Sequence, residues 1–213
     1  MHRELELGPL THAVGTRTLI MGILNITPDS FSDGGRHRST EDALEHARAM
    51  VAEGADIIDV GGESTRPGAT EVDADEELAR VLPVLERLTP EIAVPISIDT
   101  YKASVADRAL AAGATIVNDV WGLQRDPDMA AVAARHGASV VIMHNRRDVD
   151  AAIDILADIR RFFLRSLLLA ERAGIPDRRI VLDPGIGFGK TLEQNVETIA
   201  RLSELRAIGL PLL

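Results

Sequence analysis

Near the end of the sequence, the segment from Asp183 to Thr191 (D-P-G-I-G-F-G-K-T) combines glycine, lysine and threonine as a phosphate-binding loop does. A P-loop needs a glycine five positions before the glycine of its Gly-Lys-Thr triplet, and Pro184 stands there instead. The dinucleotide-binding pattern G-x-G-x-x-G fails as well, because Lys190 occupies the place of its third glycine. The segment is therefore not a nucleotide-phosphate loop, and its glycines serve another purpose.

Other residues with chemical capacity stand at the carboxyl ends of short apolar runs. They are Asn25, Asp59, Asp99, Asn118, Asp119, His144 and Asp183. A single aspartate after a strand commonly caps the next helix, so Asp99 and Asp183 taken one at a time could be only caps. Six predicted strands carry Asn, Asp or His at the same place, their carboxyl end, and this favours one shared polar site.

The groups of this shared site limit its chemistry. The sequence has no Ser-His-Asp order, no H-E-x-x-H motif and no cysteine, and an isolated histidine such as His144 is more often structural than a ligand. What remains are carboxylate and amide oxygens in an apolar frame that includes Met143 and Phe188. Such acceptors suit a flat heterocycle with several N–H donors, and each charge-assisted hydrogen bond to it would contribute roughly 1.5–3 kcal/mol.

Two further segments have the composition of loops that close over a ligand. Asn25–Gly35 follows the first apolar run and Gly61–Gly68 follows the second, and both are rich in glycine, proline and hydroxyl side chains. The first is about twice the usual length of a connection from strand to helix, although both could be ordinary turns. Arg66 is the natural group to hold an anion between them.

Parallel strands would bring these residues together. The apolar runs are apolar on both faces, which is typical of strands in a parallel sheet covered by helices. We predict strands at Thr18–Leu24, Ile57–Val60, Val94–Ile98, Thr115–Asn118, Ser139–Met143 and Arg179–Leu182.

Helix start signals separate the predicted strands. Ser39-Thr40-Glu41-Asp42 has the pattern of a capping box and predicts a helix to about Glu53, with Gly54 just past its end. A long amphipathic helix is indicated by apolar residues that recur every three or four positions, namely Ile153, Leu156, Ile159, Phe163 and Leu167. Further helix starts are predicted at Asp73 to Glu76, at Asp126-Pro127 and at Thr191 with Gln194.

The alternation of strands and helices predicts a parallel α/β protein. The pattern alone leaves open whether the sheet is doubly wound or closed. Polar groups at nearly every strand end favour a TIM (β/α)₈ barrel, in which these ends converge on one mouth, over an open sheet with a single switch point. No linker or change in composition divides the 213 residues, so we expect one domain over residues 1–213.

Composition excludes several classes of partner. The formal net charge of −10 argues against binding to nucleic acid or to an anionic membrane, both of which need clustered Lys and Arg. The absence of cysteine excludes disulfides and thiolate metal sites and suits a reducing, cytoplasmic location. The first residues lack the apolar region of a secretory signal, and no apolar run approaches the length of a transmembrane helix.

The two loop segments carry a family resemblance. Met21–Gly35 (M-G-I-L-N-I-T-P-D-S-F-S-D-G-G) and Gly54–Ala69 (G-A-D-I-I-D-V-G-G-E-S-T-R-P-G-A) closely resemble the two signature segments of the dihydropteroate synthase family. S-I-D-T at Ser97–Thr100, N-D-V at Asn118–Val120 and the glycine-rich segment that begins at Asp183 match in order too. The resemblance covers essentially the whole chain. It implies a TIM barrel of the folate pathway that joins 4-aminobenzoate to 6-hydroxymethyl-7,8-dihydropterin diphosphate, giving dihydropteroate and pyrophosphate with Mg²⁺.

The resemblance also implies roles for individual residues. Asp99, Asn118 and Asp183 would bind the pterin edge, and Met143, Phe188 and Gly189 would lie near the ring. Asn25 would be linked to Mg²⁺ and, with Thr65, would bind the diphosphate. The aminobenzoate pocket would be formed by Phe31, Ser32, Arg66 and Pro67 from the two loops. The glycines at 185, 187 and 189 would let the backbone pass close to the ring. A full-length member is expected to form a homodimer.

The sequence departs from the family at two places. Six complete strand–helix units precede Gly209–Leu213, which has the pattern of the start of a seventh strand, and the family's later Ser-Arg-Lys and Arg-x-His segments have no counterpart. We therefore expect a C-terminally truncated barrel that is poorly active or insoluble alone, or one that is closed by a partner, because an open barrel exposes strand edges. Arg146 and Arg147 stand where members usually have methionine and glycine, and they are either exposed loop charges or part of an anion site.

Two rival functions stay open at this point. One is a pterin-binding domain for methyl transfer to a corrinoid protein, which would share the barrel but has no use for the loops at 25–35 and 61–68. The other is a non-catalytic relative that binds pterin or only assembles with another subunit.

Overall fold

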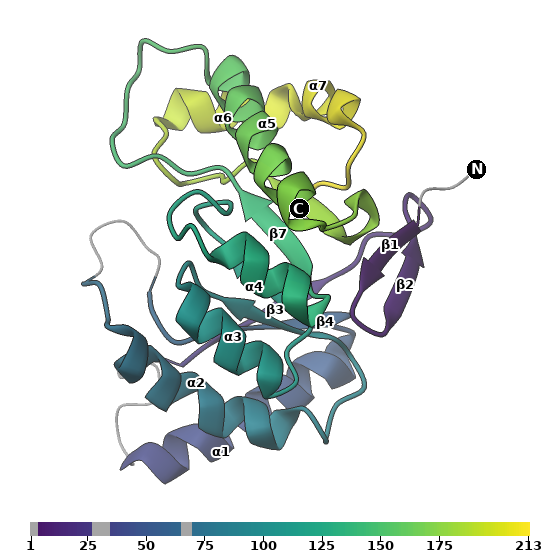
Figure 1. Cartoon of the computed structure of the whole chain (residues 1–213), viewed down its shortest axis with the longest axis vertical. Coiled ribbons are helices and arrows are strands. Elements are labelled where there is room, and N and C mark those ends of the chain that lie inside the picture. Colours follow the sequence, from purple (N-terminus) through teal and green to yellow (C-terminus); the bar gives the residue numbers. More distant parts are fainter. Residues whose placement is uncertain (1–3, 27–34, 65–69) are drawn as a thin grey trace.

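Six parallel strands form the main sheet of the protein, in the order β3-β4-β5-β6-β7-β8. Figure 1 labels three of them, β3, β4 and β7. The structure, a computed structural model, describes residues 4–26, 35–64 and 70–213, with only the backbone described for residues 35–39. The strands are β3 (Met21–Asn25), β4 (Ile57–Gly61), β5 (Ile96–Asp99), β6 (Ile116–Asp119), β7 (Ser139–Met143) and β8 (Ile180–Asp183). Every neighbour in the sheet is also the next strand along the chain, which is the strand order of a (β/α)₈ barrel.

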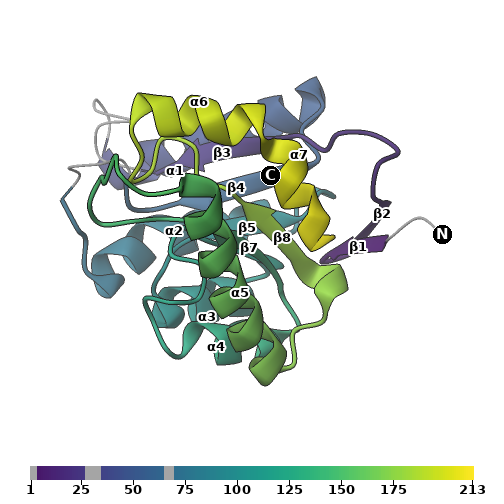
Figure 2. The ribbon, with the colours of Figure 1, turned by 90° about the horizontal axis from the view of Figure 1, so that it is seen from above.

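Helices follow the strands and lie around the outside of the sheet (Figure 2). They are α1 (Gly35–Glu53), α2 (Ala74–Leu88), α3 (Ala103–Ala111), α4 (Met129–His136), α5 (Ile155–Ala173), α6 (Leu192–Ala200) and α7 (Leu202–Leu205), with short 3₁₀ turns at Asp177–Arg179 and Arg206–Ile208. Adjacent strands pair in parallel throughout, so a strand–helix–strand unit is repeated around the sheet. The fold is the TIM-barrel type that the sequence predicted.

All six predicted strands are present, and each begins or ends within a few residues of its prediction. A hairpin of β1 (Glu4–Leu7) and β2 (Leu10–Ala13) was not predicted. Its signal was the alternation of Glu and Leu in β1, which buries Leu5 and Leu7. Past β8, Leu182 N–H donates to the carbonyl of Pro211 and Leu213 N–H to the carbonyl of Leu182, both at 2.9 Å. The last residues therefore run parallel to β8, as expected for the start of another strand.

The helix starts were predicted with mixed success. Asp73 caps α2 by accepting a hydrogen bond from the N–H of Glu76, and Thr191 with Gln194 forms the predicted capping box of α6. The prediction at Ser39 is wrong, because α1 already begins at Gly35. The prediction at Asp126 is wrong as well: this carboxylate accepts the N–H of Ala103 at 2.8 Å and so joins α3 to the loop before α4.

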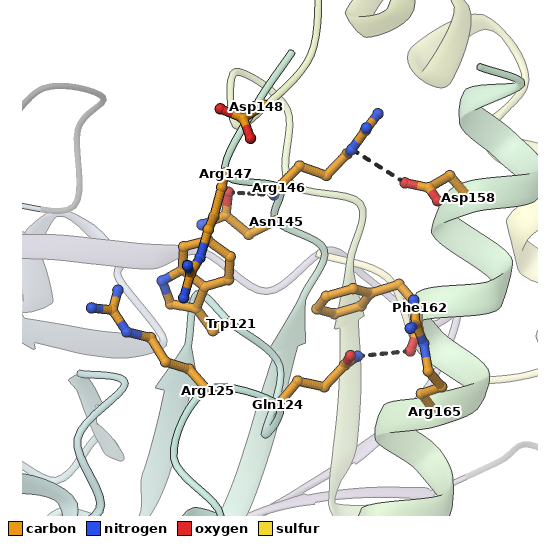
Figure 3. Close-up of a pocket in the computed structure, with 10 residues that line it drawn as sticks. All are labelled: Trp121, Gln124, Arg125, Asn145, Arg146, Arg147, Asp148, Asp158, Phe162 and Arg165. Carbon is orange, nitrogen blue, oxygen red and sulfur yellow. Dashed lines mark hydrogen bonds and ion pairs between the residues drawn. The ribbon is translucent and has the colours of Figure 1, made fainter. Parts of the chain in front are cut away.

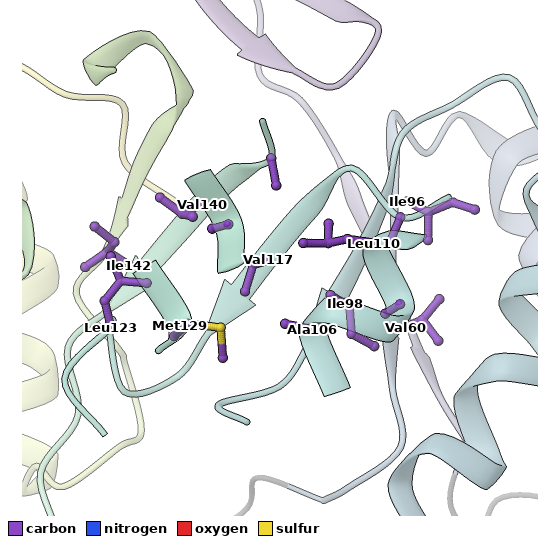
Figure 4. Packing of buried hydrophobic residues seen from close by; sticks show 14 of the residues in the cluster. Val60, Ile96, Ile98, Ala106, Leu110, Val117, Leu123, Met129, Val140 and Ile142 are labelled. Atoms are coloured by element: carbon purple, nitrogen blue, oxygen red, sulfur yellow. The ribbon is translucent and has the colours of Figure 1, made fainter. Parts of the chain in front are cut away.

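Side chains of the strands divide between two faces of the sheet. The outer face packs against the helices, as Ile98 and Val117 do with Ala106, Leu110 and other residues of α3 and α4 (Figure 4). The inner face has an apolar lower part, where strand residues pack against the hairpin. This smaller cluster comprises Leu5, Leu7, Ile57, Ile116, Val141 and Val181. Because side chains alternate along a strand, the residues two and four positions further on also lie on the inner face, at the carboxyl ends.

No helix in the described part of the chain is long and apolar enough to cross a bilayer.

Candidate functional site

A row of polar residues crosses the inner face at the carboxyl ends of four adjacent strands. Asn25 of β3 pairs in register with Gly61 of β4, Gly61 with Asp99 of β5, and Asp99 with Asn118 of β6. Residues that pair in register project from the same face, so three chemically capable side chains converge here. A Cβ atom built on Gly61 would lie 3.4 Å from Asn25 Oδ1 and 3.5 Å from Asp99 Oδ2. The glycine thus leaves a space between these two side chains.

A second carboxylate, Asp59, lies below this row and orients Asn118. Asn118 Nδ2 donates to Asp59 Oδ2 at 2.9 Å, and Asp59 is almost fully buried. The bond uses the donor end of the amide and leaves Asn118 Oδ1 as an acceptor. Among the described residues, neither Asn118 Oδ1 nor Asp99 Oδ1 has a hydrogen-bond partner, and both atoms are buried. Buried acceptors without donors are costly, by about 1–3 kcal/mol each, so this pair is suited to a ligand that brings N–H groups.

The electrostatic setting of these carboxylates is unusual. Burial, followed by the nearby Asp59 carboxylate, raises the pKa of Asp99 well above its usual range. Burial also raises the pKa of Asp59 and of Asp183. Carboxyl groups with raised pKa values in a polar recess are characteristic of binding and catalytic sites, because a ligand that donates hydrogen bonds restores the stability of the charged form.

The other side of the recess is formed by β7 and β8. Met143 and Asp183 pair in register, so both side chains lie on the inner face, just above the row described first. Met143 is buried and belongs to a small apolar cluster with Tyr101 and Val120, against which Trp121 and Phe188 pack. This cluster gives the recess an apolar wall beside its acceptors, which is the composition of a pocket for a ring with polar edges.

The glycine-rich segment after β8 holds Asp183 in place. Asp183 Oδ1 accepts the N–H of Gly185 at 2.7 Å, and Gly185 has a φ of +66°. Lys190 Nζ donates to the carbonyls of Gly185 at 2.6 Å and Phe188 at 3.0 Å, and burial lowers the pKa of Lys190 to about 8. Gly189 approaches the loop after β7 closely, since a Cβ built there would lie 2.6 Å from Arg146 Cβ. Through its two hydrogen bonds to backbone carbonyls, the Lys190 ammonium group binds the glycine-rich segment to which it belongs.

The alternative that Asp99 and Asp183 are only helix caps does not hold. The N-cap of α3 is Lys102 and that of α6 is Thr191. Two other polar residues at strand ends do have structural roles on the outer face. Asp119 accepts the N–H groups of Trp121 and Leu123 at 2.8 Å each. His144 is buried against the ring of Phe162, with Nε2 3.3 Å from Asp158 Oδ2.

A buried ion cluster, which sequence reasoning missed, anchors the segment after β4. Lys102 Nζ donates to Glu63 Oε2, and to Glu77 Oε2 at 2.5 Å, while the Tyr101 hydroxyl donates to Glu63 Oε1 at 2.8 Å. The side chains of Glu63 and Glu77 are 6% and 1% exposed. No motif marks these contacts, because they join residues 25 to 39 positions apart. The cluster fixes Glu63, which directly precedes the remainder of the Gly61–Gly68 loop.

Several residues with expected roles lie outside the described part of the chain. These are Phe31, Ser32, Thr65, Arg66 and Pro67. Within the described ranges, no group of three or more His, Cys, Asp or Glu side chains is arranged to hold a metal ion by itself. Asn25 is exposed at the end of β3, so its amide oxygen is accessible to a ligand. The described residues thus bring Asn25, Asp99, Asn118, Met143 and Asp183 together on the inner face at the carboxyl ends of the strands, and Phe188 packs on the cluster that contains Met143.

Comparison with known proteins gives consistent results. Residues 21–213 match the family described as "Pterin binding enzyme". The chain is 53% identical to dihydropteroate synthase of Bacillus subtilis over 197 residues, which are 92% of this chain and 69% of that protein. It is 46% identical to dihydropteroate synthase of Clostridium beijerinckii, over 98% of this chain and 77% of that protein.

Solved structures agree with these matches. The crystal structure of dihydropteroate synthase from Clostridium difficile in the presence of pteroic acid superposes with a TM-score of 0.90 at 55% identity, covering 93% of this chain and 75% of that one. The Xanthomonas albilineans dihydropteroate synthase with 4-aminobenzoic acid superposes with a TM-score of 0.92 at 44% identity, covering all of this chain and 77% of that one.

Proposed function

This chain belongs to the pterin binding enzymes and, among them, to the dihydropteroate synthases; we propose that Asp99, Asn118 and Asp183 bind the pterin ring of its substrate. It is a transferase that joins 6-hydroxymethyl-7,8-dihydropterin diphosphate to 4-aminobenzoate, giving 7,8-dihydropteroate and pyrophosphate. Its substrates are small molecules. The proposal concerns which side chains perform each part of this reaction.

One observation carries the pterin assignment: two buried acceptors without donors lie on paired strands, on the same face of the sheet. Asp99 Oδ1 and Asn118 Oδ1 lie side by side on paired strands and have no partner in the described part of the chain. A dihydropterin presents amino and ring N–H groups along one edge and would satisfy both. Each charge-assisted bond contributes roughly 1.5–3 kcal/mol, so analogues that lack those donors should bind poorly.

The walls of the recess support the placement of the ring. Met143 and Phe188 belong to the same apolar cluster and flank the end of β8, so we propose that they contact the ring faces. Gly189 would leave space beside Phe188 for the ring. Asp183 would accept a hydrogen bond from the far side of the heterocycle, because it lies on the inner face beside Met143.

The diphosphate end is assigned to Asn25 and Thr65. Mg²⁺ commonly binds through one or two protein oxygens together with substrate phosphates and water, and the exposed amide oxygen of Asn25 fits that role. Bound there, Mg²⁺ would supply charge stabilisation to the departing diphosphate. Asn25 and Thr65 would orient the phosphates.

The two loops supply the second substrate pocket in this proposal. Phe31 and Ser32 would come from the first loop, and Arg66 and Pro67 from the second, with Arg66 pairing with the carboxylate of 4-aminobenzoate. The buried cluster of Lys102, Glu63 and Glu77 supports this assignment, since it gives the second loop a rigid starting point two residues before Thr65.

The chemistry follows from the groups present. The carbon–oxygen bond between the pterin methylene and the diphosphate breaks, and the electron pair leaves with the diphosphate. The electron-rich dihydropterin stabilises the cationic methylene, and the amine nitrogen of aminobenzoate then forms the new carbon–nitrogen bond and loses a proton to water. Orientation and charge stabilisation provide the acceleration, so no side chain need act as a strong base.

Calorimetric titration tests the assignment. Asp99→Asn and Asp183→Asn should weaken the binding of 6-hydroxymethylpterin about 10- to 100-fold, because each removes a charged acceptor. Asp128→Asn, at an exposed aspartate whose side chain does not cap α4, is the matched control. Unchanged affinity in both site variants would contradict the pterin assignment. Formation of dihydropteroate, followed with and without Mg²⁺, reports on the Asn25 part of the proposal.

We propose a single pterin-binding domain over 1–213, a homodimer when the enzyme is full length and a cytoplasmic setting, all on the basis of the family resemblance. Light scattering of the purified full-length enzyme distinguishes a dimer from a monomer directly, and a monomer at micromolar concentration would contradict that part.

A further inference from the structure

A cavity of about 470 Å³ lies outside the candidate site, between the connections that follow β6 and β7 and one side of α5 (Figure 3). Trp121 and Arg125 come from the first connection, Arg146 and Arg147 from the second, and Phe162 and Arg165 from α5. Cavities of this size hold small ligands, and two aromatic walls with several polar groups are the usual composition of such a site. We call this space the arginine pocket.

The arginine pocket is positively charged in an acidic protein. Four arginines and two aspartates line it, although the whole chain has a net charge of −10. Arg147 and Arg165 make no hydrogen bond or ion pair with any described residue. Arg125 Nη2 donates to Glu71 at 2.7 Å, but that carboxylate is 69% exposed and is thereby screened by water. The excess positive charge is therefore not balanced locally.

Arg146 adds a second, independent observation. Its Nη1 atom is buried and has no hydrogen-bond partner in the described part of the chain. The nearest carboxylate, Asp158, is 3.5 Å from Arg146 Nε, and it already accepts from Arg161 at 2.6 Å and contacts His144 at 3.3 Å. An unsatisfied guanidinium donor costs about 1–3 kcal/mol unless an acceptor reaches it.

Two aromatic rings pack against Arg125, which lines the arginine pocket. The guanidinium of Arg125 lies 4.0 Å from the ring centre of Tyr101 and 5.5 Å from that of Trp121. Trp121 also packs on the apolar cluster that contains Met143. The pocket shares no lining residue with the row Asn25, Asp99 and Asn118 or with Asp183.

We propose that the arginine pocket binds a phosphate-type oxyanion, with inorganic pyrophosphate as its best small probe. Planar guanidinium groups match the oxygens of phosphate in paired hydrogen bonds, and several arginines around one space favour a multiply charged anion over a single carboxylate. The cavity is large enough for two linked phosphates. This site goes beyond the pterin and aminobenzoate assignments and does not depend on them.

Titration of the purified protein at low salt tests the site, with inorganic phosphate, pyrophosphate and benzoate as separate probes. We expect pyrophosphate to bind more tightly than phosphate, and phosphate more tightly than benzoate. Arg147→Gln with Arg165→Gln should weaken pyrophosphate binding at least tenfold, roughly the loss of one charged hydrogen bond. Arg172→Gln, at an exposed arginine further along α5, is the matched control and should bind as the unchanged protein does.

The titrations are made in EDTA, so that binding of pyrophosphate through Mg²⁺ at the proposed diphosphate site does not contribute. Pyrophosphate affinity that is unchanged in the double arginine variant would overturn the inference, and so would the absence of pyrophosphate binding at millimolar concentration. Because Arg147 and Arg165 make no bonds to described residues, the double variant should keep its melting temperature. If it does not, Arg165→Gln alone is compared with Arg172→Gln. Binding of 6-hydroxymethylpterin, measured on the same variants, reports the pterin assignment separately.

Discussion

The amide of Asn118 is held by Asp59 through a bond of 2.9 Å from Nδ2 to Oδ2, which occupies the donor end of the amide and leaves its buried oxygen as a free acceptor among the described residues. Asp59 itself lies one layer below, opposite Ser97 of β5, where no ligand needs to reach it. The carboxylate is therefore a positioning group: it selects which end of the amide faces a ligand.

Asp59→Ala should impair pterin binding without touching the ligand. Loss of the acceptor frees the Asn118 amide to rotate and to present Nδ2 toward the pterin edge, where donors would oppose donors. We expect affinity for 6-hydroxymethylpterin to fall about 10- to 100-fold, the usual effect of losing a group that orients a ligand-contacting residue. Asp59→Asn can still accept from Asn118 and should retain most of the affinity. Equal losses in the two variants would contradict the orienting role.

Lys102→Met should destabilise the whole protein. The substitution leaves the buried carboxylates of Glu63 and Glu77 without their shared cation, and removing one partner of a buried ion pair costs about 3–5 kcal/mol. Urea unfolding measures this directly. The triple variant Lys102→Met, Glu63→Gln, Glu77→Gln should recover a large part of the loss, because no uncompensated charge then remains buried. A triple variant as unstable as Lys102→Met would show that packing, not charge, accounts for the effect.

The sequence predicted the parts of this site that depend on local pattern. The strand Ser139–Met143 and the capping box at Thr191 follow from residues that are neighbours in the chain, and alternation along the strands then places Asp99, Asn118 and Asp183 on one face. The structure supplies what depends on register between distant segments.

The cluster of Lys102 with Glu63 and Glu77, and the bond from Asn118 to Asp59, belong to that second kind. Neither has a spacing that sequence alone reveals, because each joins side chains that are 25 to 59 positions apart in the chain. Asp126 shows that a local pattern can also predict a contact that the tertiary structure does not make. Its sequence context is that of a helix cap, but α4 begins only at Met129, and one oxygen of the Asp126 carboxylate accepts the distant N–H of Ala103.

The free energy of unfolding should fall as the pH drops below the ordinary pKa of a histidine side chain. Burial, and then the nearby Lys190 charge, lowers the pKa of His144 to about 4, while the unfolded side chain has a pKa near 6.5. Between these values the unfolded state binds the extra proton, so the stability present above pH 6.5 is progressively lost toward pH 4, by on the order of 3 kcal/mol.

A comparison with His144→Asn isolates this effect. Asp119 titrates in the same window with the opposite sign, because burial raises its pKa to about 6 and the folded state takes up that proton first. The unchanged protein and the His144→Asn variant both contain Asp119. Any difference between them in how the unfolding free energy changes from pH 7 to pH 5 therefore arises at position 144. Parallel pH profiles for the two proteins would show that His144 does not titrate as described.

Gly185 and Gly187 offer a matched pair for testing how the glycine-rich segment positions Asp183. Both have positive φ, +66° and +88°, so alanine at either position carries backbone strain of about 1–2 kcal/mol. They differ in their surroundings: a Cβ on Gly185 would lie 2.0 Å from the carbonyl oxygen of His144, whereas a Cβ on Gly187 would have no heavy atom within 4 Å.

Gly187→Ala should therefore lose stability alone, whereas Gly185→Ala must also move the loop away from β7. That movement breaks the 2.7 Å bond from Gly185 N–H to Asp183 and displaces the carboxylate from the recess. We expect pterin affinity to fall at least tenfold in Gly185→Ala and to change less than threefold in Gly187→Ala, about the effect of one charged hydrogen bond. If the two variants bind pterin equally well, the close approach to His144 is not what holds Asp183 in position.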